Sequence, residues 1–246
     1  MVITIDELTI IAGSKGFDIA IIEKDYLLTY LLYTIKDVEG IYFKGGTALN
    51  KIFLKHQRIS EDLDFTLSRS LPSVEKDIRD RLKGTIFSNI EEGNKVEGFT
   101  RLIVHYKLFH EAGTIFIDLN ERGKMLLKPK RFMVPHFYGR HIPRFEVRCI
   151  HQNEIIAEKV MAACQRYKPR DYFDLYYIIK RNLPLSIGLV RKKFRANNEK
   201  FSSYLLFKNT NRIFNKWEDD LSSLTKTLPS FNKVMPVIKK KVKYRE

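Results

Sequence analysis

The sequence has little of what marks secreted, zinc-binding or membrane-spanning proteins. Two cysteines, Cys149 and Cys164, among 246 residues are too few for a disulfide framework, and no Cys/His spacing typical of zinc sites occurs. The apolar stretches are all broken within a few residues, so no segment is predicted to span a membrane. Asp6 and Glu7 come too early for a secretory signal peptide. We therefore expect a reduced, cytoplasmic protein with no membrane partner.

The composition also excludes a disordered chain. Apolar residues make up 44% of the sequence and aromatic residues 12%, which is enough to bury a core. A chain of 246 residues forms one large domain or two modest ones. No internal repeat or low-complexity tract interrupts it.

Acidic residues are fewer than basic ones, 29 against 44, and they are unevenly distributed. The net charge is +15, yet residues 1–121 hold 15 Lys/Arg against 19 Asp/Glu. Residues 122–170 hold 12 basic and 3 acidic residues, and residues 180–216 hold 10 and 1. A surface decorated evenly with lysine would not leave the first half negative. The asymmetry favours binding of a polyanion such as RNA by the second half of the chain.

A glycine pair stands where a strand pattern changes into a helix pattern. The apolar residues 41–43 precede Lys44, Gly45, Gly46 and Thr47, after which apolar residues recur with helical spacing through residue 55. Glycines at such a turn let the backbone approach an anion, and the free N–H groups at the start of the helix attract phosphate. Ordinary turns also contain Gly-Gly pairs, so the motif alone does not establish a site.

Two carboxylates share one face of the next predicted strand, residues 62–67. Strict alternation places leucine and phenylalanine on one face and Asp62, Asp64 and Thr66 on the other. Carboxylates side by side repel each other unless a cation lies between them, so the pair predicts a site for Mg²⁺ or Mn²⁺. A solvated strand edge is the alternative interpretation.

A third carboxylate belongs to a predicted hairpin. The apolar runs 99–108 and 113–119 flank the turn residues 110–113, which predicts two paired strands. Asp118 would point the same way as Asp62 and Asp64 if its strand lies beside theirs. It is a further candidate metal ligand, or an exposed aspartate at a strand end.

The rest of the chain is predicted to be mostly helical. Residues 5–37 predict two helices with a break at 13–16 and Asp6 as N-cap, and residues 73–93 predict another. The basic, proline-containing segment 121–148 is predicted to be a linker or an RNA-facing loop. Helices are then expected over 152–167, 171–182, 186–197, 201–219 and 220–228, with a frayed tail over 233–246.

One lysine and two aspartates stand out among these helices. Lys159 lies beside the apolar stripe of its helix, where it either snorkels to water or reaches a phosphate. Asp171 follows Pro169 and fits an N-cap, which would put Asp174 at the third helical position. Capping would explain both aspartates without any function.

Four blocks in this order resemble the AbiEii/AbiGii group of nucleotidyltransferase-like toxins, within the DNA polymerase β-type nucleotidyltransferase superfamily. The first block is an Ile-Glu-Lys-Asp-Tyr run, and the second joins Gly-Gly-Thr-Ala-Leu to an Arg-x-Ser-x-Asp-x-Asp-Phe pattern. The blocks cover residues 22–26, 45–65, 154–159 and 169–175. The order of the four is far more specific than any one block.

The resemblance implies an α/β fold, with a mixed-sheet nucleotidyltransferase-like core over residues 1–148 and a helical C-terminal region over 149–246. It implies metal-dependent transfer of a nucleotide from a nucleoside triphosphate to an acceptor, by family analogy the 3′ end of a tRNA. The role would be that of the toxin of a toxin–antitoxin or abortive-infection system, with a cognate antitoxin as partner.

The resemblance also implies roles for single residues. Asp62 and Asp64, with Asp118, would hold the metal, and Lys159 and Asp174 match the family's functional pair by their spacing. The nucleotide would be bound by Lys44, Gly45, Gly46, Thr47 and Ser60. Typical polymerase-β-type enzymes carry a Gly-Ser pair closer to the Asp-x-Asp motif than the sixteen residues found here. Whether Thr47 or Ser60 supplies the phosphate-binding hydroxyl therefore stays open.

Two other functional classes remain compatible with these motifs. A non-catalytic module would bind nucleotide or RNA without turnover. A nucleotide-sugar-dependent glycosyltransferase would also use an Asp-x-Asp motif, although the basic C-terminal half argues against a neutral sugar acceptor.

Overall fold

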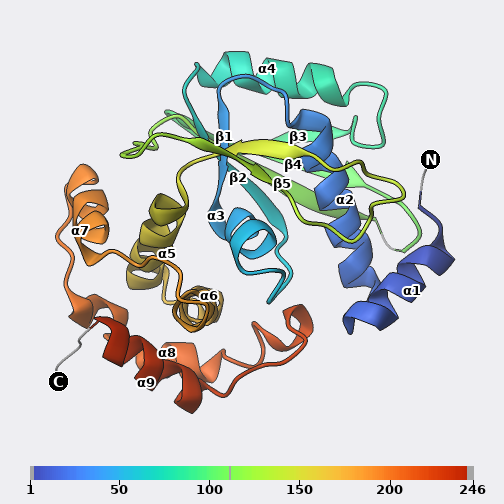
Figure 1. Cartoon of the computed structure of the whole chain (residues 1–246). Helices are drawn as coiled ribbons and strands as arrows, with labels where there is room; N and C mark the ends of the chain where they lie inside the picture. The colour runs from blue at the N-terminus through green and yellow to red at the C-terminus, as the bar shows by residue number, and fades with distance from the viewer. Residues whose placement is uncertain (1–2, 111, 243–246) are drawn as a thin grey trace.

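A mixed β-sheet organises the chain and separates two layers of helices (Figure 1). The computed structural model describes residues 3–110 and 112–242. Within them seven strands pair in the order β3-β4-β5-β2-β1-β7-β6. The pairs β2–β5 and β1–β7 are parallel and the others antiparallel. The strands are β1 Ile41–Lys44, β2 Asp62–Leu67, β3 Ile90–Val96, β4 Phe99–Tyr106, β5 Gly113–Asn120, β6 Lys130–Met133 and β7 Glu146–Cys149. The predicted α/β fold is confirmed.

The chain begins with two helices, α1 Ile5–Lys15 and α2 Ile19–Ile35. Thr4 caps α1 by a capping box with Glu7, so the predicted N-cap at Asp6 is wrong by two residues. The helix ends at Gly16 in the left-handed conformation, and Asp18 caps α2. The break therefore begins at Gly16, the last residue of the predicted 13–16 and a glycine that can adopt a positive φ, and it extends to Asp18.

Strand β2 has the two faces that its sequence predicts. Leu63, Phe65 and Leu67 are buried, whereas Asp62 and Asp64 are only half-buried. Helix α4, Leu71–Leu82, covers one side of the sheet and packs against α2, while α3, α5 and α6 lie on the other (Figure 1). Burial of each leucine or phenylalanine contributes about 1.5–3 kcal/mol, which fixes the strand's register and leaves both aspartates on the α5 side.

Two segments differ from their predictions, and a third matches. The predicted helix 73–93 ends at residue 82, and β3 follows as a charged edge strand whose polar side chains give no apolar alternation. The segment 121–148, predicted to be irregular, contains β6 and the first residues of β7. The hairpin of β4 and β5 is confirmed, with Glu111 of its turn outside the described residues.

The C-terminal third is helical, as predicted, but its last part is divided differently. Helices α5 Gln152–Arg166, α6 Pro169–Lys180 and α7 Ile187–Ala196 match the predictions closely. The predicted helices 201–219 and 220–228 are instead the short elements η2 Ser203–Leu206, α8 Thr210–Asn215 and η3 Ser222–Leu224. No helix in the described ranges is apolar over a length that would cross a bilayer.

The predicted frayed tail is wrong for most of its length. Residues Phe231–Val242 form helix α9, which packs against α6. Val234, Met235 and Ile238 recur at helical spacing and are buried. This apolar face stabilises the helix against α6, although the segment is rich in lysine. Residues 243–246 of the predicted tail lie outside the described residues.

The turn from β1 into α3, Gly45–Ala48, requires glycine. Gly45 has a φ of 75°, and a Cβ added there would lie 1.9 Å from the Asp64 Oδ2 atom. Helix α3 continues as one turn of π-helix, η1 Leu49–Phe53, where the sequence predicts a single helix. The missing side chain thus lets the glycine turn and the Asp-x-Asp strand touch.

Replacing Gly45 by alanine is expected to lower the melting temperature. A non-glycine residue at positive φ costs about 1–3 kcal/mol, and the new methyl group must also displace the Asp64 carboxylate. Gly84→Ala is the matched control, because Gly84 has a φ of 72° and no heavy atom lies within 4 Å of its added Cβ. A Gly45→Ala protein as stable as Gly84→Ala would contradict the close approach of the two motifs.

Candidate active site

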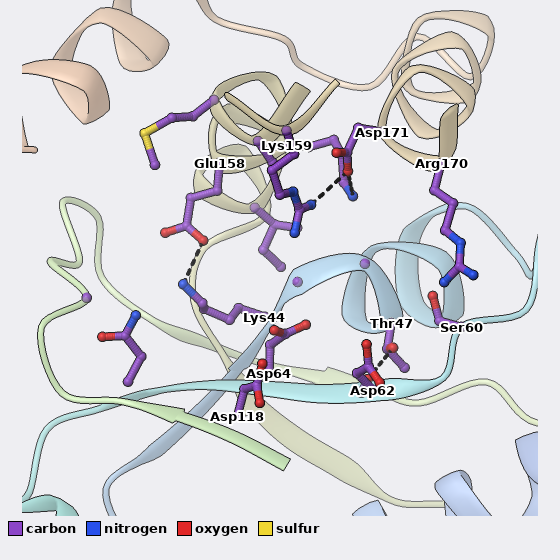
Figure 2. Close-up of a pocket in the computed structure, with 18 of the residues that line it drawn as sticks. Lys44, Thr47, Ser60, Asp62, Asp64, Asp118, Glu158, Lys159, Arg170 and Asp171 are labelled. Atoms are coloured by element: carbon purple, nitrogen blue, oxygen red, sulfur yellow. Dashed lines mark hydrogen bonds and ion pairs between the residues drawn. The ribbon is translucent and has the colours of Figure 1, made fainter. Parts of the chain in front are cut away.

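A cleft of about 780 Å³ lies between the sheet and the C-terminal helices. Figure 2 shows Asp62, Asp64 and Asp118 on its sheet side and Lys159 and Asp171 across from them. Ten lysine or arginine side chains and six aspartate or glutamate side chains line it, an excess of positive charge that suits a polyphosphate. Every candidate site residue from the sequence lines this cleft except Asp174.

Four charged residues cross the sheet in one row beneath the cleft. Lys44 on β1 is the register partner of Asp64 on β2, and Asp64 is the partner of Asp118 on β5. Arg101 on β4 is in turn the partner of Asp118. Directly paired residues of neighbouring strands point to the same face. The row therefore runs positive, negative, negative, positive, and Asp118 points the same way as Asp64, as predicted.

The two aspartates of β2 bear a negative charge that no ion pair neutralises among the described residues. Burial raises the pKa of the Asp64 carboxyl to about 6, helped by the nearby Asp118 and Asp62 charges and opposed by Lys44. Burial, with the charges of Glu61 and Asp118, also raises the pKa of Asp62. Like charges held together at low solvent exposure are the electrostatic condition that a divalent cation relieves.

Asp118 differs from the other two carboxylates. Its two oxygens accept hydrogen bonds from Arg101 Nε and Nη2, each at 2.7 Å. No group of three or more His, Cys, Asp or Glu side chains is arranged to hold a metal ion in the part of the chain that the structure describes. The donor set that fits a hard cation is thus the oxygen pair of Asp62 and Asp64.

Three hydrogen-bond donors converge on Gly46. A Cβ placed on this residue would lie 3.0 Å from Arg58 Nη2, 3.6 Å from Ser60 Oγ and 3.8 Å from Lys159 Nζ. The space beside Gly46 is therefore surrounded by a guanidinium, a hydroxyl and an ammonium group. At the first turn of a helix this arrangement favours an anion such as phosphate.

The two hydroxyls that the sequence left open have different geometry. Thr47 is buried and its Oγ1 donates to the Asp62 carbonyl oxygen, so its proton ties α3 to β2. Ser60 Oγ accepts from Arg58 Nη1 at 2.9 Å, which leaves the Ser60 proton to donate. Ser60 is thus better placed than Thr47 to bind phosphate through its side chain.

Asp174 lies behind the cleft in a fully buried ion pair. Its carboxylate accepts from Arg58 Nε at 2.9 Å and Nη2 at 2.8 Å, from Asn50 Nδ2 at 2.9 Å, and pairs with Lys159 Nζ at 2.9 Å. Burial opposes its ionisation, but Arg58 and Lys159 outweigh burial and lower the pKa to about 2. The structure therefore gives Asp174 the position of a residue that orients two cleft cations.

Lys159 does not snorkel to water. Its side chain is 6% exposed and its Nζ also pairs with Asp171 Oδ1 at 3.0 Å. Burial lowers the pKa of Lys159, but the charges of Asp174 and Asp171 more than offset it and raise the value. The lysine is thus held charged at the edge of the cleft.

Asp171 is not the N-cap of α6. The helix begins at Pro169 with Lys168 as N-cap, because proline is favoured at the first helical position. Asp171 Oδ1 instead accepts from Lys159 and, at 2.9 Å, from Arg166. The sequence prediction of a cap missed this contact because it joins two helices.

Sequence reasoning also missed several charged residues that complete the cleft. Glu158 bridges Lys44 at 3.1 Å and Lys193 at 2.9 Å, and so fixes α5 and α7 relative to β1. Arg58 and Arg101 also line the cleft. Arg58 pairs with Asp174, and Arg101 pairs with Asp118. Arg58 stands in the Arg-x-Ser-x-Asp pattern and Glu158 in the block 154–159, so both were marked by a motif. No motif of the sequence marked Arg101 or Lys193.

Solved structures share this fold. MenT4, a nucleotidyltransferase toxin from Mycobacterium tuberculosis H37Rv, superposes with a TM-score of 0.73 at 18% identity, covering 98% of this chain and 88% of that one. JHP933 from Helicobacter pylori superposes with a TM-score of 0.59 at 17% identity, covering 92% and 95%. No curated protein matches the sequence.

A protein family matches most of the chain. Residues 27–237 fit the family described as nucleotidyl transferase AbiEii toxin, type IV toxin–antitoxin system. The match contains the glycine turn, the Asp-x-Asp strand and both helices that supply Lys159 and Asp174, and it confirms the resemblance drawn from the sequence. The chain therefore belongs to the AbiEii nucleotidyltransferase toxin family of type IV toxin–antitoxin systems.

Proposed function

We propose that this toxin transfers a nucleotide from a nucleoside triphosphate to the 3′ end of an RNA, such as a tRNA, with Mg²⁺ or Mn²⁺ as cofactor. The convergence of Arg58, Ser60 and Lys159 on Gly46, beside the unpaired charges of Asp62 and Asp64, carries this proposal. The cleft thus offers a phosphate site and a cation site side by side, which nucleotidyl transfer requires.

In this proposal, different residues of the cleft bind the triphosphate, the leaving group and the cation. Backbone amides of Gly45 and Gly46 and the Ser60 hydroxyl would orient the triphosphate. Lys159 would neutralise charge that develops on the leaving pyrophosphate, held in place by Asp174. A divalent cation between Asp62 and Asp64 would supply Lewis-acid polarisation of a phosphoryl oxygen. Lys44, paired to Glu158, would balance the remaining charge of Asp64.

The acceptor and the protein partner are inferred from charge and family. The basic residues Lys128, Lys130, Arg131, Arg144 and Lys192 are exposed and would bind RNA phosphates. MenT4 is itself described as a nucleotidyltransferase toxin, and membership of a toxin–antitoxin family implies a cognate antitoxin.

Incubating the protein with total RNA and each α-labelled nucleoside triphosphate tests the activity. Binding without label transfer would favour the non-catalytic module, and label on a glycan acceptor the glycosyltransferase.

Asp62→Asn and Asp64→Asn are each expected to abolish label transfer without loss of folding. Neither side chain fills the core, so amide replacement leaves no cavity, but it removes the charge that would bind the cation. Transfer at the wild-type rate by either variant would contradict the metal role.

The pH dependence of unfolding is a control for the Asp64 variant. Because the folded carboxyl has its pKa raised from 3.8 to about 6, its contribution to stability is greatest below pH 4 and is lost as the pH rises through 6. In metal-free buffer, Asp64→Asn should therefore melt above the wild type at pH 8, and the difference should shrink toward pH 4.

Lys159 and Asp174 should separate into a catalytic and a positioning residue. Lys159→Ala is expected to lower the transfer rate by ~10²–10³ and to lower the melting temperature less than Asp174→Asn does, because Asp174 keeps Arg58 and Asn50 and Asp171 keeps Arg166. Asp174→Asn breaks a buried ion pair and is expected to destabilise the fold by about 3–5 kcal/mol. Transfer rates and thermal melts of both variants test these two roles. An Asp174→Asn protein of wild-type stability would rule out the positioning role.

RNA affinity should depend steeply on salt, through the exposed basic residues. Each phosphate contact to a single strand contributes about 0.7 to the slope of log affinity against log salt. Reversing four of the charges at Lys128, Lys130, Arg131, Arg144 and Lys192 should flatten that slope and leave nucleotide binding unchanged. The control reverses the four charges of Arg69, Arg79, Lys83 and Lys95. Equal loss of RNA affinity in both sets would mean that no face is dedicated to the acceptor.

A further inference from the structure

The third carboxylate of the cleft is fully engaged by an arginine of the same sheet. Arg101 forms a two-pronged ion pair with Asp118, at 2.7 Å for each hydrogen bond. The guanidinium also lies 4.7 Å from the centre of the Phe116 ring, which holds the side chain over β5. Arg101 and Asp118 both line the cleft, so the pair stands within the proposed site and not beside it.

The strand register places the two residues of this pair opposite each other. Arg101 on β4 lies directly opposite Asp118 on β5 in an antiparallel ladder that runs unbroken from Phe99–Asn120 to Tyr106–Gly113. Sliding β4 along β5 by one residue would turn the buried side chains of β4 to the wrong face. The positions of the two residues relative to each other are therefore as firmly set as the sheet itself.

A planar guanidinium that donates to both oxygens neutralises the charge of Asp118 and so weakens its attraction for a metal ion. Asp62 and Asp64 have no such partner in the described ranges. The nearest cation of the row, Lys44, donates to Glu158. Asp118 is therefore already neutralised, whereas the carboxylates of Asp62 and Asp64 have no ion-pair partner among the described residues.

We propose that the Arg101 guanidinium serves as a built-in cation that removes Asp118 from the metal-ligand set. The chain then binds one divalent cation through Asp62 and Asp64, where three free carboxylates would bind two. This inference rests on the cation site of the proposed function. It makes Arg101 the residue that sets the metal stoichiometry of the cleft.

Equilibrium binding of Mn²⁺ to the full chain, followed by the electron paramagnetic resonance signal of the free ion and without nucleotide, tests the proposal. The wild type should bind one equivalent, lost in Asp64→Asn. Arg101→Ala should bind a second equivalent, and so should Arg101→Gln, which keeps the side-chain stem over Phe116. The double variant Arg101→Ala/Asp118→Asn should return to one, because the new site needs the freed carboxylate.

Arg170→Ala is the matched control for net charge. Arg170 also lines the cleft and pairs with Glu61 at 2.9 Å, with a similar side-chain exposure of 37% against 32% for Arg101. Glu61 keeps Lys24 as a second partner, so this variant should add no equivalent.

The outcomes that contradict the proposal are distinct. Two equivalents in the wild type, no second equivalent in either Arg101 variant, or a second one in the Arg170 variant would each overturn the role of Arg101 while leaving the proposed activity standing. A wild type that binds no Mn²⁺ removable by Asp64→Asn would instead remove the cation site itself, and the inference with it.

Discussion

The buried carboxylate of Asp174 is the point on which the cleft depends. It is fully inaccessible to solvent, and it gathers Arg58 from the segment before β2, Asn50 from η1 and Lys159 from α5. Removing two or more charges from water is costly unless each finds a partner, so these four groups must assemble together. That requirement joins the helical C-terminal region to the sheet at the place where phosphate would bind.

This arrangement explains how cations can be held close together at the cleft. Arg58 and Lys159 would repel each other if they were free, but Asp174 lies between them and neutralises part of both charges. Asp171 adds a second carboxylate to Lys159 and binds Arg166 as well. The donors beside Gly46 are therefore pre-organised, and an incoming anion meets fixed groups without first having to order them.

On the sheet side of the cleft, in contrast, charges of the same sign lie side by side. The row Lys44, Asp64, Asp118 and Arg101 places cations only at its two ends. Arg101 neutralises Asp118 by a direct ion pair. Lys44 donates its hydrogen bond to Glu158 and acts on Asp64 only through its charge. The excess negative charge therefore collects on β2, whose two aspartates alternate with buried residues. Electrostatics and strand register agree on where a cation would be bound.

Local patterns in the sequence were sufficient for the elements that carry the motifs. Alternation in β2 and the glycine turn before α3 are set by neighbouring residues, so Asp62, Asp64 and Gly45 could be placed on the right faces in advance. The edge strand β3 and helix α9 were not predictable in this way: β3 is polar on both faces, and α9 depends on packing against α6.

The roles of the buried charges were decided by the tertiary structure alone. Asp174 and Arg58 are far apart in the sequence, and nothing near either residue indicates that they form a two-pronged pair. Asp171 looked like a helix cap because a cap is the local explanation for an aspartate after proline. The sequence by itself determined which side chains face the cleft from β2 and α3. Only the register of the sheet and the docking of α5 and α6 decided which of those charges are neutralised, because ion pairing depends on distances in space that local spacing does not encode.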